Sequence, residues 1–443
     1  MIDVAIIGVG PAGIEAAREA KERGLRAVLV GMTPPGGRAA MGSLLPSKVW
    51  LHAADHANSG HPVDAGSITS EIRATQQAWT DSLGAECADA DIPVHRGKAV
   101  VVSPTEVEVR SPEDDSVIET LTARFILIAT GSEPSFPEGV KPDGERIIAP
   151  RHTQTLTTVP EHIVFIGEGV TATEYASAFA RLGSRVEIFA FFDTLLPAGE
   201  PSAARFITRH IEEDLGVTIH RNDMVVETSR NGEGVHTRAK SGRVVESDFA
   251  FIATGRHPDL SVIEQGPDSL SRQFERTPDG GLHTDEQGRT SLETVFAAGD
   301  AAGAPLIANK ATWQARRAVR SMAGADLSDL PPAENLIHAV YTNPQVAWIG
   351  PVSRLSQTPT DTVGILERSY ERLLLARIDH VEDGFLKLWY DRDSRTVLAA
   401  SAAGHSAAEL LTPVQLAMHN DLSVDTLSSM PGPHPTFSEL IGA

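Results

Sequence analysis

Two short glycine-rich segments have the residue types and spacing of a turn that binds a pyrophosphate. Their small residues are Gly8, Gly10 and Gly13 in the first segment and Gly167, Gly169 and Ala172 in the second. The first glycine permits a tight turn, the second lets the backbone approach a phosphate, and the third small residue lets a helix pack close to its strand. The free N–H groups at the start of that helix favour an anion. The spacing therefore predicts two dinucleotide-binding turns.

Each turn is placed between a buried strand pattern and an amphipathic helix pattern. Strand patterns at residues 4–7 and 163–166 precede the turns, and further strand patterns follow the helices at 27–30 and 186–189. One constant offset of 159 residues relates the two segments through strand, turn, helix and strand. Because such a match through four elements is hard to obtain by chance, the sequence predicts an internal repeat of nucleotide-binding βαβ units.

Each half also closes on a buried strand that ends in Ala-Thr-Gly. These residues are Ala129, Thr130 and Gly131 in the first half and Ala253, Thr254 and Gly255 in the second. A third apolar strand, at residues 295–298, runs into Gly299 and Asp300. Here a carboxylate and backbone N–H groups can face a sugar-like or phosphate ligand, so we expect Asp300 to contact a nucleotide.

The remainder of the chain has a different pattern. Residues 338–341, 384–390 and 397–400 alternate like antiparallel strands, and a helix pattern covers residues 407–419. We therefore predict an α/β fold class with two Rossmann-like dinucleotide-binding domains plus a C-terminal α+β domain. The predicted domains are residues 1–145 with 266–330, residues 146–265, and residues 331–443.

Composition excludes several classes of partner. The 443 residues carry a net charge of −21, which argues against nucleic acid or an anionic membrane, because phosphates are bound by clustered Lys and Arg. No apolar run approaches the roughly 20 residues of a membrane span. The chain opens directly on a strand pattern, without the basic and apolar segments of a secretory signal, so we expect a cytoplasmic protein.

Other reactive residues form no recognised site. Cys87 is the single cysteine, so the chain has no internal disulfide, and no basic neighbour activates its thiol. We interpret it as an incidental thiol at a helix end or in a loop. The 16 histidines show no metal-binding spacing; His52 and His56 are an i, i+4 pair without a third ligand. No metal site is predicted.

Taken together, these motifs resemble the pyridine nucleotide–disulfide oxidoreductase family, which includes dihydrolipoamide dehydrogenase, glutathione reductase and mercuric reductase. The resemblance covers nearly the whole chain. It implies FAD in the first domain, NADH or NADPH in the second, and a homodimer formed through the third. The residues that it implies for FAD are Gly8, Gly10, Pro11, Ala12, Gly13, Lys48, Ala129, Thr130, Gly131, Gly299 and Asp300. Those that it implies for NAD(P) are Gly167, Gly169, Ala172 and Gly255.

The resemblance breaks where the family keeps its redox disulfide. The family motif is G-G-x-C-x-x-x-x-C-x-P-x-K, and the chain keeps its glycines, proline and lysine in the segment 36–48. Ala39 and Leu44 stand at the two cysteine positions. Neither side chain is a nucleophile or a redox couple, which excludes thiol–disulfide exchange through this helix. The resemblance places Leu44 as an apolar wall over the flavin.

Four residues of the family's chemistry survive. Lys48 matches the lysine near flavin N5, and Glu174 matches the glutamate that pairs with it. His434 and Glu439 match the family motif H-P-T-x-x-E, in which the glutamate orients a histidine acid/base that reaches into the partner subunit's active site. A histidine–carboxylate pair suits proton transfer near neutral pH. Without the resemblance, His434 would be interpreted as a structural histidine in a proline-rich turn.

The nucleotide slots depart from the usual pattern. An acidic residue after the second strand of a Rossmann unit usually accepts the adenosine ribose hydroxyls. Gly31 and Ala190 occupy these slots, again 159 residues apart, and the second slot also lacks basic residues for a 2′-phosphate. Val170 replaces the tyrosine with which many relatives gate the nicotinamide. The choice between NADH and NADPH therefore stays open.

The leading hypothesis is a cysteine-independent FAD oxidoreductase that passes electrons from NAD(P)H to a small acceptor such as a quinone. Two alternatives stay open. One is a non-catalytic FAD-binding or scaffold relative, favoured by Ala39, Leu44, Gly31 and Ala190. The other is an electron-transfer flavoprotein that a protein partner reduces, favoured by Ala190.

Overall fold

The structure, a computed structural model, describes residues 2–57, 64–357 and 361–442 and divides into two compact units. Unit 1 consists of Met1–Pro46, Ser70–Ser135 and Gly255–Leu330. Unit 2 consists of Ser47–Thr69, Phe136–Thr254 and Pro331–Ala443. The second glycine turn and the C-terminal region thus share one unit. The finer division into three domains stays a prediction.

Unit 1 is built on a sheet of strand order β3-β2-β1-β6-β5-β4, with β17 beside β6. β1 pairs in parallel with β2 and β6, and the long β6 continues into an antiparallel pairing with β5. The last four residues of β1 are all buried, as is typical of a central strand covered on both faces. The strands are β1 Ile2–Ile7, β2 Ala27–Gly31, β3 Val94–Arg96, β4 Lys98–Ser103, β5 Glu106–Arg110, β6 Val117–Ile128 and β17 Val295–Ala297.

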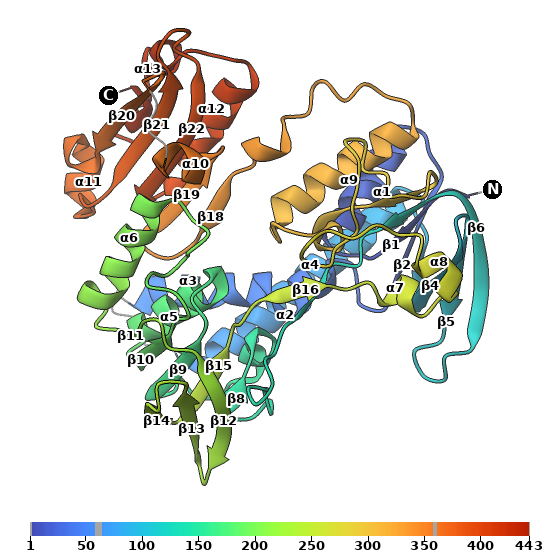
Figure 1. Cartoon of the computed structure of the whole chain (residues 1–443), viewed down its shortest axis with the longest axis horizontal. Coiled ribbons are helices and arrows are strands. Elements are labelled where there is room, and N and C mark those ends of the chain that lie inside the picture. Colours follow the sequence, from blue (N-terminus) through green and yellow to red (C-terminus); the bar gives the residue numbers. More distant parts are fainter. Residues whose placement is uncertain (1, 58–63, 358–360, 443) are drawn as a thin grey trace. The chain divides into compact units, whose positions relative to one another are not determined.

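The helices α1 and α9 lie side by side in unit 1 (Figure 1). Buried alanines of both, including Ala16 and Ala315, allow this close packing. A short ribbon joins β7 (Ser132–Pro134) to β16 (Arg256–Pro258). The helical elements here are α1 Pro11–Glu22, α2 Gly37–Gly42, α3 Leu44–Ala57 and α4 Ala65–Asp89, which both extend into unit 2, α7 Ser261–Glu264, α8 Asp268–Ser271, η3 Gly299–Ala302 and α9 Ala308–Met322.

Unit 2 holds a second parallel sheet, of order β11-β10-β9-β15-β8, and an antiparallel ribbon β12-β13-β14. Its strands are β8 Ile147–Ile148, β9 His162–Ile166, β10 Arg185–Phe189, β11 Thr218–His220, β12 Val225–Asn231, β13 Gly234–Ala239, β14 Val244–Ser247 and β15 Phe249–Ile252. Its helical elements are η1 Pro150–Thr155, α5 Val170–Arg181, α6 Pro201–Arg209 and η2 His210–Asp214.

The internal repeat is confirmed residue by residue. We call β1-α1-β2 the first repeat and β9-α5-β10 the second repeat. The helices α1 and α5 each contain 12 residues, and their bounds differ by the predicted offset. The strand register agrees too, because Val4 lies opposite Ala27 and Ile163 lies opposite Val186.

The C-terminal region of unit 2 is an antiparallel sheet of order β18-β19-β22-β21-β20, against which α12 packs. The predicted strands and the predicted helix are present, and β19 and β20 are additional. The elements are η4 Ala333–Asn335, β18 His338–Val340, β19 Gln345–Ile349, α10 Val352–Gln357, β20 Val363–Ser369, η5 Tyr370–Arg372, α11 Leu374–Asp379, β21 Phe385–Asp391, β22 Val397–Gly404, α12 Ala407–His419, α13 Val424–Ser428 and α14 Glu439–Gly442. Among the described residues, no helix is long and apolar enough to span a membrane.

Candidate functional site

The first glycine turn tolerates no larger residue at two positions. Gly8 has a φ of +122°, and a Cβ built there would lie 2.1 Å from the carbonyl oxygen of Ala129. A Cβ on Gly13 would lie 1.9 Å from the carbonyl oxygen of Gly8. The turn, the start of α1 and the Ala-Thr-Gly end of β6 therefore meet at contact distance.

Space is left open where a pyrophosphate would be bound. A Cβ on Gly10 would meet nothing within 4 Å. Gly10 is the N-cap of α1 and has no side chain that could cap the helix. Pro11 lies in the first turn of α1, and Ala12 is buried. The first N–H groups of a helix have no partner inside the helix, so they are available to an anion. These residues fit the pyrophosphate of FAD.

The second glycine turn repeats this geometry. Gly167 has a φ of +118°, and its Cβ would lie 2.3 Å from the carbonyl oxygen of Ala253. The space at Gly169 is open, and this N-cap of α5 has no side-chain capping bond. Ala172, in place of the third glycine, is fully buried. The turn fits a second dinucleotide. Gly255, also of positive φ, begins the segment that returns to unit 1, and its role toward NAD(P) stays a prediction.

Asp300 belongs to a polar cluster beside the first turn of α1. A Cβ on Gly299 would lie 3.5 Å from the Cβ of Ala12, which places the Gly-Asp turn next to that helix. Ser132 Oγ donates to Asp300 Oδ2 at 2.5 Å. Arg256 donates through Nε to Ser132 Oγ at 2.7 Å and through Nη2 to the Ser132 carbonyl at 2.6 Å. Burial lowers the pKa of Arg256, while the Asp300 charge acts in the opposite direction.

Sequence reasoning missed the roles of Ser132 and Arg256 in this cluster. Both residues directly follow an Ala-Thr-Gly segment, at equivalent positions of the two closing strands. That position was the available signal, but the ribbon that brings them together joins strands 124 residues apart. Ser132 and Arg256 hold the Asp300 carboxylate in place.

Lys48 and Glu174 form the ion pair that the resemblance predicts. Lys48 Nζ lies 2.8 and 2.7 Å from the two carboxylate oxygens of Glu174, which is 3% exposed. Trp50 stacks on Phe179 at 4.9 Å between ring centroids and so packs α3 against α5. The role of the pair at a flavin stays a prediction.

Tyr341 completes this cluster, and sequence reasoning did not find it. Its N–H donates to Glu174 Oε1 at 3.0 Å, and Lys48 Nζ lies 4.7 Å from the centroid of its ring. Burial, and then the Glu174 charge, raise the pKa of the Tyr341 hydroxyl. Lys48 is thus held by a carboxylate and by the face of an aromatic ring.

The segment that replaces the redox disulfide is two helices rather than the single helix predicted. α2 ends at Gly42, Ser43 leaves the helical conformation with φ −137° and ψ −76°, and α3 begins at Leu44. Glycine and serine favour such a break because they stabilise a helix interior poorly. Ala39 and Leu44 therefore lie on different helices. Leu44 is 44% exposed, and its contact with a flavin stays a prediction.

Arg38, next to Ala39, ties α2 to the strand end of β6. It pairs with the carboxylates of Glu133 and Asp259, and its Nη2 donates to the Thr130 carbonyl at 2.8 Å. Burial acts to raise the pKa of Asp259, but the hydrogen bond from Arg38 holds it below its usual value. Two ion pairs and a hydrogen bond of Arg38 thus hold α2, which has no thiol, against the end of β6.

His434 and Glu439 are also in contact. His434 Nδ1 lies 2.8 Å from Glu439 Oε2, and the Thr436 N–H donates to Oε1 at 2.7 Å. The hydrogen bond from His434, and then that from Thr436, lower the pKa of Glu439. His434 itself is 64% exposed. In the part of the chain that the structure describes, no hydrogen bond or ion pair joins it to Lys48 or Glu174.

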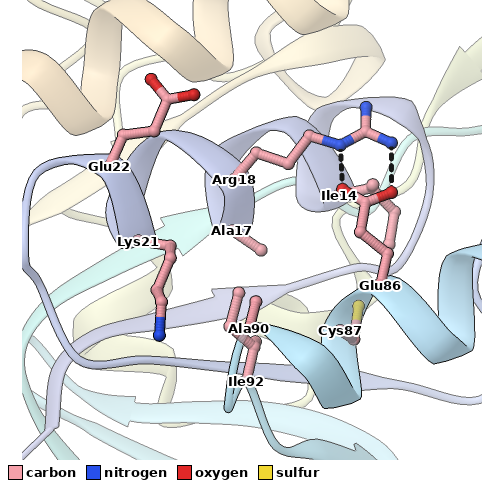
Figure 2. Close-up of a pocket in the computed structure, with 9 residues that line it drawn as sticks. All are labelled: Ile14, Ala17, Arg18, Lys21, Glu22, Glu86, Cys87, Ala90 and Ile92. Atoms are coloured by element: carbon pink, nitrogen blue, oxygen red, sulfur yellow. Dashed lines mark hydrogen bonds and ion pairs between the residues drawn. The ribbon is translucent and has the colours of Figure 1, made fainter.

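The remaining reactive residues considered in the sequence are Cys87, His52 and His56. Cys87 is buried in the last turn of α4, where it lines a small pocket with Arg18, Lys21 and Glu86 (Figure 2). Burial raises the pKa of its thiol, which opposes formation of the reactive thiolate. His52 and His56 lie exposed on α3, and no group of three or more potential metal ligands occurs among the described residues.

Comparison with known proteins links these features to one family. A family model described as "Pyridine nucleotide-disulphide oxidoreductase" matches residues 2–315, and the model of its dimerisation domain matches residues 337–443. Dihydrolipoyl dehydrogenase of Chlorobaculum parvum is 29% identical, over 99% of this chain and 95% of its own. A Mycobacterium tuberculosis protein named NAD(P)H dehydrogenase (quinone) is 26% identical, over 98% of this chain and 91% of its own.

Solved structures share the same fold. LpdA from Mycobacterium tuberculosis aligns over 100% of this chain and 98% of its own with a TM-score of 0.93 and 24% identity. The flavoprotein disulfide reductase RclA from Escherichia coli aligns over 99% of this chain and 98% of its own with a TM-score of 0.86 and 21% identity. These similarities confirm the predicted fold class.

Proposed function

Because the chain belongs to the pyridine nucleotide-disulphide oxidoreductase family, we propose that it is an FAD-dependent NAD(P)H oxidoreductase that reduces a small acceptor, such as a quinone, without cysteines. One observation carries the proposal: Ala39 and Leu44 replace both redox cysteines, while the His434–Glu439 pair keeps its contact. A proton donor retained without thiols indicates that another acceptor takes the proton.

The family binds FAD and NAD(P)H, and the two glycine turns fit both dinucleotides. Bound FAD would supply hydride transfer from NAD(P)H and two-electron transfer to an acceptor. Lys48 supplies a positive charge on α3, and Glu174 holds it in one position with two hydrogen bonds. Asp300, which accepts the Ser132 hydroxyl hydrogen bond, would accept hydrogen bonds from ribityl hydroxyls in the ribityl–phosphate region of FAD.

His434 supplies the proton that a quinone needs besides a hydride equivalent. Glu439 accepts the hydrogen bond of Nδ1, so Nε2 is the ring nitrogen left to donate a proton to an acceptor. Glu439 in turn is fixed by the Thr436 N–H. The carboxylate keeps the ring oriented and stabilises the imidazolium before the proton leaves. In a homodimer, His434 would act in the partner subunit's site.

The Mycobacterium tuberculosis relative named NAD(P)H dehydrogenase (quinone) supports a quinone as the acceptor. The match to the family's dimerisation domain supports the homodimer. A cytoplasmic location and the three-domain division stay part of the proposal.

The test is an anaerobic titration of the flavin-loaded protein with NADH or NADPH, followed by addition of benzoquinone. We expect the flavin absorbance to bleach with a nicotinamide nucleotide and to return with the quinone. Lipoamide, which needs a thiol pair, should not restore it. A Cys87→Ala variant should give the same rates, because this buried thiol has no part in the chemistry.

The two alternatives give other results in the same experiment. A scaffold relative, favoured by Gly31 and Ala190, would show no bleaching with any donor. An electron-transfer flavoprotein, favoured by Ala190, would bleach only with a reducing protein partner. Bleaching by either nucleotide without return by benzoquinone would contradict the acceptor class alone.

A further inference from the structure

The carboxylate of Glu168 lies at the nucleotide slot of the second repeat. Glu168 is the residue between Gly167 and Gly169, and it is half-buried. Its Oε2 accepts the Phe191 N–H at 3.0 Å, just beyond the end of β10. Its carbonyl oxygen accepts the Leu196 N–H at 2.8 Å. Two bonds to the loop after β10 therefore fix Glu168, and its side chain points to that loop.

The slot residue itself cannot bind a ribose. Ala190 has no polar side-chain atom and is fully buried. A carboxylate bound to the Phe191 N–H lies beside the same strand end, where an acidic residue usually accepts ribose hydroxyls. Among the described residues, Glu168 Oε1 accepts no hydrogen bond. Since a carboxylate can accept several hydrogen bonds, Glu168 has capacity left for hydroxyl donors.

The first repeat shows that the turn itself brings the side chain between the two glycines close to the end of the second strand. Val9 is equivalent to Glu168, and Gly31 is equivalent to Ala190. A Cβ built on Gly31 would lie 2.9 Å from a methyl carbon of Val9. In both repeats, therefore, the side chain between the glycines lies over the end of the second strand. Only in the second repeat is that side chain charged.

The surroundings favour a ribose without a 2′-phosphate. A guanidinium bonded to the loop after β10, that of Arg221, donates to both oxygens of Glu212 at 2.7 and 2.6 Å and to the Asp193 carbonyl at 3.0 Å. Its charge is thus already neutralised. The exposed rings of Phe191 and Phe192, whose centroids are 4.9 Å apart, offer apolar surface to an adenine.

We propose that Glu168 accepts the adenosine ribose hydroxyls of NADH and excludes NADPH by repelling its 2′-phosphate. The inference rests on the proposed function, because it identifies the nucleotide of that same site. A phosphate placed against a carboxylate suffers like-charge repulsion, whereas two hydroxyls can donate to it. Glu168 is then the residue that determines specificity, in place of an acid at Ala190.

The test measures binding without electron transfer. NAD⁺ and NADP⁺ are titrated calorimetrically into the flavin-loaded wild type and Glu168→Gln. We expect the wild type to bind NAD⁺ at least about tenfold more tightly, the size of one charge-assisted hydrogen bond. In Glu168→Gln the amide keeps an oxygen for the Phe191 N–H but loses the charge, so the preference should fall to near one.

Asp193→Asn is the matched control, because it removes a neighbouring exposed charge from the same loop. It should leave the ratio of the two dissociation constants unchanged. An equal change in both variants would overturn the inference in favour of a general charge effect. Wild-type protein that prefers NADP⁺, or that binds neither nucleotide, would also overturn it.

Failure of the inference and failure of the proposed function are distinguishable. Flavin bleached by NADPH but not by NADH contradicts the role of Glu168 and leaves the oxidoreductase intact. Selective binding of NAD⁺ without bleaching by NADH supports Glu168 and contradicts the enzyme.

Discussion

Val9 and Glu15 of the first repeat correspond to Glu168 and Glu174 of the second. The two repeats therefore share a backbone arrangement but differ in some of their side chains. Glu15 is buried and pairs with Arg316 of α9, whereas Glu174 is buried and pairs with Lys48 of α3. The same position thus pairs with a neighbouring helix of unit 1 in one repeat and holds the Lys48 ammonium in the other. The fold therefore sets where a side chain lies, and the type of side chain and its partner set what it does.

Substitution of the third small residue should change stability and flavin content strongly in the first turn and weakly in the second. Gly13→Ala places a Cβ 1.9 Å from the Gly8 carbonyl oxygen, a clash that should cost about 1–3 kcal/mol and release the flavin. The second repeat already has alanine there, so Ala172→Gly should cost only about 1 kcal/mol and keep the flavin bound. Flavin content and urea unfolding of the two variants check this. Equal flavin loss in both variants would show that the third residue of each turn has the same influence on flavin binding.

Substitution of Glu174 should affect mainly the reaction rate, whereas substitution of the equivalent Glu15 should affect mainly the stability of the fold. Glu174→Gln leaves the Lys48 ammonium without its charged partner, so we expect acceptor reduction to slow about tenfold, or roughly 1.4 kcal/mol of barrier. Glu15→Gln should reduce stability by about 1 kcal/mol through the lost ion pair and leave the rate unchanged. Stopped-flow rates and thermal unfolding measure both. A similar loss of rate in Glu15→Gln would show that the two positions have not diverged.

The second strand of each repeat, β2 or β10, should contribute differently to the loss of stability at acid pH. Glu187 of β10 is buried and accepts hydrogen bonds from His162 at 3.0 Å, His220 at 2.7 Å and Arg185 at 2.8 Å. Burial acts to raise the pKa of Glu187, but the hydrogen bond from His220 and the neighbouring charges hold it below the ordinary value of 4.5. Because the native pKa is lowered, the stabilisation is present above pH 4.5 and is lost as pH falls through the native value.

Val28 of β2 occupies the equivalent position, so Glu187→Val copies the first repeat. We expect the variant to lose about 1 kcal/mol at pH 7, from unpaired histidines, and to show a smaller fall in stability below pH 4.5 than the wild type. Thermal unfolding at stepped pH measures the slope. An unchanged slope would locate the acid response in another carboxylate.

Much of the molecule could be predicted from residue spacing alone. The glycine turns, the offset between the repeats and the replacement of both cysteines by Ala39 and Leu44 are local patterns, because strand, turn and helix formation depend on neighbours in sequence. The antiparallel C-terminal region followed from alternation in the same way. The break at Ser43 was missed because a retained helix motif masked the weak helix propensity of Gly42 and Ser43.

The partners of individual side chains were decided by tertiary structure. Arg38 meets Asp259 across 221 residues, and Tyr341 meets Glu174 across 167. Glu168 reaches Phe191 only because β9 and β10 pair in parallel and end together. Such contacts depend on strand register and on the direction of each side chain, which no local pattern encodes. Residue spacing therefore sufficed for the two βαβ repeats and for the absence of cysteine at positions 39 and 44, whereas strand packing placed the Glu168 carboxylate beside the end of β10.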